Sequence, residues 1–218
     1  MQSQVRGGTR WKRFAVVMVP SVAATAVIGV ALAQGALAAS FAVSGQEFKV
    51  TADELDGLGM TQYGGIDAGV DYESGKVTKQ HAVAISGFDS AKITNMCQSV
   101  VTPLPGGNKV TLRLQAGHKG KPVTADTLYI DSSALDANAV MTNINIGVAA
   151  GAAGASGPNA KGPGIGKGDH TAPGGFAQEA ERAVLTDVEQ TAWATSAGTF
   201  TLNGLSLRLH WGDDKQCY

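Results

Sequence analysis

The 218-residue sequence contains few of the motifs on which catalytic, metal and nucleotide sites usually depend. It has two cysteines, no CxxC pair, and four histidines that stand far apart, without the i, i+2 or i, i+4 spacing of a local metal pair. No serine lies in a Gly-x-Ser-x-Gly elbow, the strained turn that exposes the nucleophile of common serine hydrolases. The sequence therefore predicts no catalytic residue, no metal site and no cofactor.

A glycine-rich stretch at residues 162–168 resembles a phosphate-binding loop but lacks its required positions. Lys161 stands where the leading glycine would be, and Gly168 follows Lys167 where serine or threonine is needed. The surrounding residues 149–175 are mostly Ala, Gly, Pro, Lys and Asn. Such a composition buries little apolar surface to offset the entropy of ordering, so we expect a flexible loop here.

The N-terminus has the three parts of an export signal. Arg10-Trp11-Lys12-Arg13 precedes an apolar or small-residue run from Phe14 to Ala33, and Ala36-x-Ala38 then offers a peptidase site before Ala39. The run of about twenty residues is long for a signal core and long enough for a membrane-spanning helix. Residues 1–38 are therefore predicted to be a cleaved signal peptide, or alternatively an uncleaved apolar helix that anchors the chain in the membrane.

Residues 39–218 are predicted to form a single exported domain, either extracellular or anchored on the outer face of the cytoplasmic membrane. Removing residues 1–38 also removes four positive charges and lowers the formal net charge from −1 to −5. A mildly acidic domain lacks the basic footprint of a nucleic-acid-binding protein. The membrane, contacted through the N-terminal segment, is thus the expected partner, and nucleic acid is not.

The only two cysteines, Cys97 and Cys217, are expected to form a disulfide, because an even pair outside the cytoplasm is typically oxidised. The bridge closes a loop of about 120 residues, for which chain entropy gives about 4 to 5 kcal/mol of stabilisation. It would tie the C-terminal tail to the body of the domain.

Short alternating segments separated by Gly, Pro, Asn and Asp indicate an all-β domain. Strands are expected at four places, which are Phe48–Thr51, Ala82–Ile85, Lys109–Leu114 and Thr199–Leu209, with Asn203-Gly204 as a turn or bulge. In Val110–Leu114 and Leu205–Leu209 every second residue is apolar, which predicts one buried and one solvated face. The one candidate helix, Phe176–Val184, is short and equally fits the start of a strand.

A motif of the form Ala-x-apolar-Thr-Asn/Asp-apolar occurs three times, beginning at Ala91, Ala139 and Ala183. Val50–Leu55 and Val123–Leu128 form a second related pair. Repetition on this scale predicts a supersecondary unit used more than once, as a mostly antiparallel curved sheet or a solenoid-like sandwich. In this interpretation Asn95, Asn143 and Asp187 occupy equivalent turn or bulge positions.

Three segments together resemble an exported family of actinobacterial proteins of unknown function, whose members often carry the automatic label cholesterol esterase. These segments are Val43–Leu55, Ile93–Val100 and Gln190–Leu205. The resemblance covers nearly the whole chain, including its basic and apolar start and the cysteine near its end. The family has no established catalytic residues, so the resemblance assigns none here.

Two functional hypotheses follow. The first is a non-enzymatic cell-envelope protein that binds a lipid, another apolar ligand or a membrane protein, with an apolar groove between curved strands. Its candidate lining residues are Met96, Trp193, Phe200 and Trp211. The second is a secreted lipid-ester hydrolase without the usual motif, which requires a serine hydroxyl, an imidazole and an acid to converge in the fold.

Overall fold

The computed structural model describes residues 46–70, 77–154, 160–166 and 168–218. Within these ranges the chain is all-β and contains no α-helix, only a short 3-10 turn at Pro105–Gly107. No helix among the described residues is long and apolar enough to span a membrane. The predicted N-terminal helix, the signal peptide at residues 1–38 and the cleavage site at Ala38 and Ala39 lie outside the described residues.

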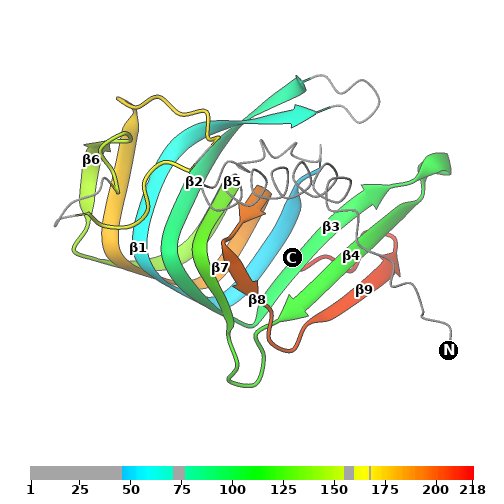
Figure 1. The fold of residues 1–218 in the computed structure, drawn as a ribbon. Coiled ribbons are helices and arrows are strands. Elements are labelled where there is room, and N and C mark those ends of the chain that lie inside the picture. The colour runs from blue at the N-terminus through cyan, green and yellow to red at the C-terminus, as the bar shows by residue number, and fades with distance from the viewer. Residues whose placement is uncertain (1–45, 71–76, 155–159, 167) are drawn as a thin grey trace, which may run out of the picture. The chain divides into compact units, whose positions relative to one another are not determined.

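Four long strands close into an antiparallel barrel (Figure 1). They are β1 (Phe48–Val70), β2 (Val77–Thr94), β5 (Val123–Thr142) and β7 (Phe176–Ser196). Neighbours pair in the order β1, β2, β5 and β7. The ring closes where β7 returns to the start of β1, with Phe48 opposite Ala192 and Ala52 opposite Val188.

Five shorter strands extend this barrel. β3 (Met96–Pro103), β4 (Lys109–Ala116) and β9 (Ser206–Trp211) continue the sheet outward from the start of β1, and we call these three strands the wing. β6 (Asn145–Ala149) pairs with the start of β7, and β8 (Thr199–Thr201) pairs with β5. Figure 1 shows the wing to the right of the barrel.

The predicted curved antiparallel sheet is confirmed, whereas the solenoid-like sandwich is replaced by a closed barrel with added strands. The segment expected as one strand at Thr199–Leu209 divides at Asn203-Gly204 into β8 and β9, which pair with different partners. The candidate helix at Phe176–Val184 is the first part of β7. Its buried Ala177, Ala180 and Ala183 recur every three residues and imitate a helical period.

The three repeated motifs share a backbone feature that explains their spacing. Asn95, Asn143 and Asp187 all adopt a positive φ, of 51°, 52° and 54°. Residues three apart in a regular strand point to opposite faces. The left-handed residue inserts a local turn, so that Ile93 and Met96 both enter the core. Leu185 and Val188 flank Asp187 and are buried in the same way.

Each of these left-handed residues is bonded to a polar side chain on the neighbouring strand. Asn95 Nδ2 donates to Asp53 Oδ2. Asn143 Nδ2 donates to Glu181 Oε1 at 2.6 Å, and Asp187 Oδ2 accepts from Asn138 Nδ2 at 2.9 Å. Asn and Asp tolerate the left-handed conformation better than other non-glycine residues, which accounts for their recurrence in the sequence.

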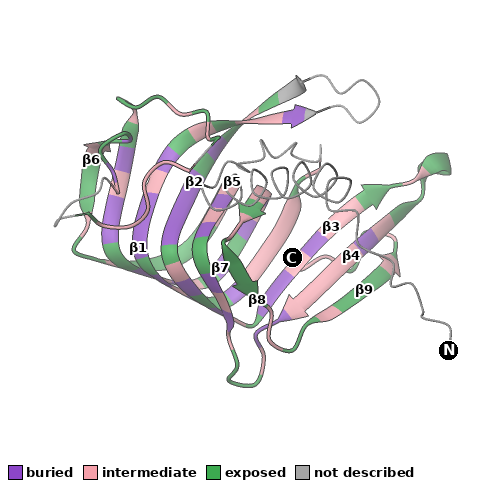
Figure 2. Cartoon of the chain, in the orientation of Figure 1, coloured by how far each residue is buried: buried purple, intermediate pink, exposed green. Residues whose placement is uncertain are grey.

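The main core fills the barrel with interlocking small and large side chains, and Figure 2 shows buried bands running across its long strands. Phe88, Leu128 and Val123 are among the most deeply buried, together with several alanines of β7. A second cluster on the other face of β1 and β2 includes Tyr63 and Ile85. The described parts of the 149–175 segment lie over that second cluster.

The 149–175 segment contacts β1 and β5 through glycine and proline residues. Thr61 Oγ1 donates to the Pro163 carbonyl at 2.7 Å, and Tyr129 OH donates to the Gly164 carbonyl at 2.9 Å. Gly162 has a φ of +90°, and a Cβ there would stand 2.7 Å from the backbone of Gly59. Glycine therefore permits a backbone-to-backbone approach here. The flexibility expected for residues 149–175 stays a prediction.

We predict that Asn95→Val destabilises the protein by about 1 to 2 kcal/mol, because the left-handed conformation is sterically unfavourable for a β-branched residue. Asn95→Gly should cost less, although it loses the same exposed side-chain bonds. Lys92→Val, at an exposed position with ordinary backbone geometry in β2, is the matched control. Urea unfolding of the oxidised protein measures all three, and equal costs for Val and Gly at position 95 would contradict the backbone explanation.

Candidate functional site

The most exposed apolar surface of the described domain lies along β9. Leu207, Leu209 and Trp211 alternate with Arg208 and His210, so they point to one face of the strand. Their side chains are 57%, 71% and 75% exposed. The alternating pattern predicts that this face is buried, and that prediction is wrong: no described segment covers it.

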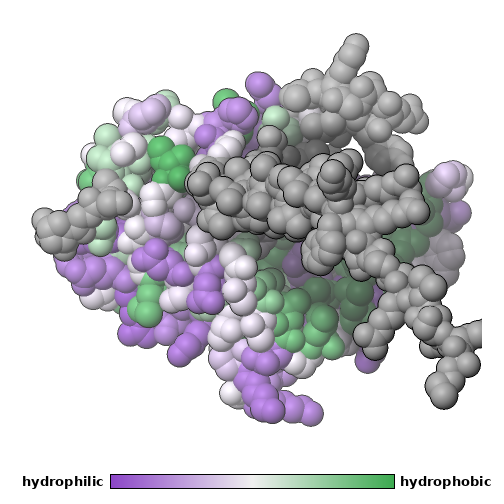
Figure 3. All heavy atoms as spheres, viewed as in Figure 1, coloured by the Kyte–Doolittle hydropathy of each residue, from purple (hydrophilic) through white to green (hydrophobic). Residues whose placement is uncertain are grey.

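This face continues across the wing towards the barrel. Leu207, Leu209 and Trp211 stand opposite Leu114, Leu112 and Val110 of β4. Leu112 in turn stands opposite Val100 of β3, and Val100 opposite Phe48 of β1, which packs on the barrel core. We call this continuous surface the inner face of the wing. In the space-filling view, apolar residues gather where β4 and β9 lie in Figure 1 (Figure 3).

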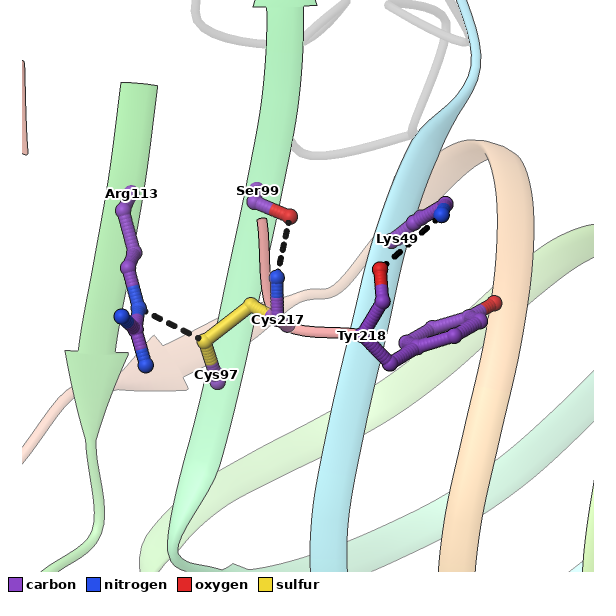
Figure 4. The surroundings of a disulfide bond; sticks show 6 residues. All are labelled: Lys49, Cys97, Ser99, Arg113, Cys217 and Tyr218. Carbon is purple, nitrogen blue, oxygen red and sulfur yellow. Dashed lines mark hydrogen bonds between the residues drawn. A yellow bond between two sulfur atoms is a disulfide. The ribbon is translucent and has the colours of Figure 1, made fainter. Parts of the chain in front are cut away.

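The opposite, outer face of the wing is covered by the C-terminal tail. Cys97 and Cys217 form the expected disulfide, which holds the tail against β3 (Figure 4). The Cys217 backbone N–H donates to Ser99 Oγ at 3.0 Å, and Lys49 Nζ donates to the Tyr218 carbonyl oxygen at 2.9 Å. Cys97, Ser99 and Thr111 thus have partners in the tail, since Thr111 Oγ1 also donates to the Gly212 carbonyl at 2.7 Å, while the apolar side chains of the inner face have none among the described residues.

Described residues line a small cavity inside the barrel. This cavity of about 20 Å³ lies between the four long strands, which is close to the space one water needs. Three of its lining side chains are polar, namely Gln62, Ser86 and Gln190. The others are apolar: Leu55, Met60, Phe88, Ile130, Leu135, Met141 and Leu185. This volume is far below the roughly 300 Å³ of a typical ligand pocket, so this cavity is not a candidate lipid site.

The residues predicted to line an apolar groove do not meet in one place. Met96 is 3% exposed and belongs to the barrel core. Trp193 stacks on His81, with ring centroids 3.6 Å apart, and Phe200 lies on β8. Only Trp211 belongs to the inner face of the wing. The sequence did carry a signal for that face, in the alternation of Leu205–Leu209.

A second candidate is a buried polar cluster beneath the 149–175 segment. Asp67 pairs directly with His81 across β1 and β2, and Asp131 stands opposite Ile85 on the same face. Asp169 Oδ2 accepts a hydrogen bond of 2.6 Å from Tyr63 OH. Asp67 Oδ2, His81 Nε2 and Asp131 Oδ1 are buried and have no hydrogen-bond partner among the described residues.

Burial dominates the electrostatics of this cluster. It raises the pKa of Asp131 to about 7, and the nearby carboxylates of Asp67 and Asp169 raise it further in the same direction. Burial and Asp169 also raise the pKa of Asp67, against a lowering by His81 and His170. Burial, followed by the bond to Asp169, raises the pKa of Tyr63. The pairing of strands that produces this cluster was not evident from the sequence.

The cluster does not assemble a hydrolytic triad. All four histidines lie in the described ranges, and no described serine hydroxyl is hydrogen-bonded to an imidazole; the one imidazole bond to a side chain is from His118 Nδ1 to Asn95 Oδ1 at 3.1 Å. Ser86 of β2 accepts a hydrogen bond from Gln62, Ser132 of β5 donates to the Ala84 carbonyl, and the neighbouring Ser133 donates to Glu47. Among the described residues no group of His, Cys, Asp and Glu is arranged to hold a metal ion.

The fold and the wing define an all-β barrel domain with a disulfide-fixed tail and an apolar face that no described segment covers. The chain belongs to a family of unknown function, DUF6230, whose model matches residues 44–218. No curated protein and no solved structure matches the chain.

We predict that Asp131→Asn stabilises the protein at pH 8 relative to wild type, and that the difference shrinks towards pH 4. The pKa of Asp131 is raised from about 3.9 in the unfolded chain to about 7, so the native state holds this proton longer and stability falls as pH rises between those values. A gain of roughly 1 to 3 kcal/mol is expected, after allowance for partial solvent access. Thermal unfolding at several pH values measures it, and a pH-independent difference would contradict the assignment.

Proposed function

We propose that the protein is an exported, non-enzymatic component of the cell envelope that binds lipid through the inner face of the wing. The observation that carries this proposal is the row of exposed Leu207, Leu209 and Trp211 that continues the barrel core onto an open surface. The N-terminal sequence of a basic segment and an apolar run supports export to a membrane surface. The disulfide is in keeping with an oxidising compartment.

The chemistry of the inner face favours an apolar ligand over a polar one. On β4 and β9 its side chains are Val110, Leu112, Leu114, Leu207, Leu209 and Trp211. None is charged, so a ligand bound there gains from contact with its hydrocarbon part and meets no acid or base. Full burial of one such side chain contributes about 1.5 to 3 kcal/mol, and several acting together suffice for micromolar binding.

Trp211 lies at the end of this row, next to Gly212 and the charged Asp213 and Asp214. An indole is suited to such a boundary, because its ring contacts hydrocarbon while its N–H remains near water or lipid headgroups. The placement favours acyl chains presented at an interface. Actinobacterial origin and lipid-ester hydrolysis stay expectations from the sequence resemblance, and the described residues supply no observation in favour of hydrolysis.

We predict that the purified exported protein co-floats with vesicles of phosphatidylglycerol and phosphatidylcholine, and that the double variant Leu209→Thr, Trp211→Thr reduces partitioning by roughly tenfold to a hundredfold. The two substitutions remove apolar area while retaining strand-forming residues. Val140→Thr, at a 68% exposed valine on β5, is the control and should bind as wild type does. Equal binding by the double variant, or no binding and no co-purifying lipid for wild type, would refute the proposal.

Export gives a separate prediction. The secreted protein should begin at Ala39, because cleavage after Ala38 satisfies the small-x-small pattern. N-terminal sequencing of protein recovered from the extracellular fraction measures this directly. A membrane-bound chain that still begins in residues 1–13 would instead establish the helical anchor and a tethered domain.

A further inference from the structure

β9 forms an open edge of the described sheet. It pairs with β4 on one side through an unbroken register from Ser206 opposite Gln115 to Trp211 opposite Val110, and no described strand pairs with its other side. The opposite end of the sheet is protected differently, because β6 is interrupted by a register shift at Gly147. A regular, apolar edge such as β9 is a template for another strand.

The hydrogen-bond pattern identifies which backbone groups of β9 face outward. The Gly212 N–H donates to the Lys109 carbonyl at 2.8 Å, so these two residues form a hydrogen-bonded pair. Such pairs alternate with non-hydrogen-bonded pairs in an antiparallel ladder. The N–H and C=O groups of Leu207, Leu209 and Trp211 therefore point to the open edge, and the same three residues carry the exposed apolar side chains.

We propose that β9 pairs with β9 of a second copy of this chain, antiparallel and with the two-fold axis at Leu209. Leu209 then faces its counterpart, and Leu207 of one copy faces Trp211 of the other. The outward N–H and C=O groups of all three residues find partners, giving six hydrogen bonds between the copies. This is the self-complementary arrangement that a two-fold dimer requires.

Charge on the other face of β9 selects this register. With the axis at Leu209, Arg208 of one copy lies opposite His210 of the other. Shifting the axis to Arg208 places the two arginines directly opposite each other, which is unfavourable. Shifting it to His210 leaves only Leu209, His210 and Trp211 paired within the strands. Of the three registers, only the one centred on Leu209 pairs five residues of each strand without placing two arginines opposite each other.

The consequence is a sheet of six wing strands, β3, β4 and β9 from each copy, whose inner face is apolar across β4 and β9 and carries Gln98 and Thr102 beside Val100 on β3. Edge pairing uses the backbone and leaves the inner face open, so dimerisation is compatible with lipid binding but does not depend on it. The open edge, which otherwise invites indiscriminate association, is closed by the pairing.

Sedimentation of the full exported chain in lipid-free buffer tests the dimer. Wild type is expected to sediment as a dimer, and Leu209→Pro as a monomer, with a dissociation constant raised at least about tenfold. Proline at this position removes an N–H that points to solvent in the monomer, so the ladder to β4 is retained. An intact disulfide and a cooperative thermal transition verify that the variant is folded.

Leu209→Thr is the matched control, because it keeps the N–H and should remain dimeric while contributing less to vesicle binding. Leu209→Cys reports the register: Cα atoms in a hydrogen-bonded pair lie about 5.5 Å apart, within disulfide range, so oxidation should link the two copies. Val140→Cys should not link. A monomeric wild type or a dimeric, folded Leu209→Pro overturns the dimer, whereas failure of vesicle binding overturns only the proposed function.

Discussion

The fold depends on a backbone constraint within its long strands. Strands of 18 to 23 residues must bend to close into a small barrel, and left-handed residues lie at two places where the ladder changes, namely Asn95 at the end of β2 and Asp187 within β7. Asn95 marks the point at which one edge of β1 passes from β2 to β3. The barrel and the wing are thus two parts of one sheet, separated by a change of direction whose cost the Asn95 to Asp53 bond helps to offset.

The local features of this sheet were predictable from the sequence, whereas its closure was not. The repeated Thr-Asn/Asp pattern identified Asn95, Asn143 and Asp187 because left-handed positions favour those residue types. Closure depends on Phe48 pairing with Ala192, a contact between distant segments that no local pattern encodes. The helical spacing of alanines in β7 was misleading for the same reason, since long-range pairing on both sides decides their conformation.

The candidate site, too, was only partly predictable from the sequence. Alternation in Leu205–Leu209 correctly indicates which residues share a face, but burial depends on whether another segment covers that face. The buried cluster around Asp131 was missed because Asp67, His81 and Asp131 come from three strands and meet only through their register. The periodicity of residue types determines which side chains share a face of a strand, whereas the topology of the sheet determines which other segments pack on that face.

The two faces of the wing differ in what packs against them. The tail beyond β9 folds back on the outer face, where the disulfide and the bonds to Ser99 and Lys49 fix it. A three-stranded sheet open on both faces and along one edge would be marginally stable and prone to nonspecific association. The disulfide and these hydrogen bonds cover part of the outer face, whereas the apolar side chains of β9 on the inner face have no cover from the described residues. The C-terminal disulfide therefore stabilises the strands whose opposite, inner face no described segment covers.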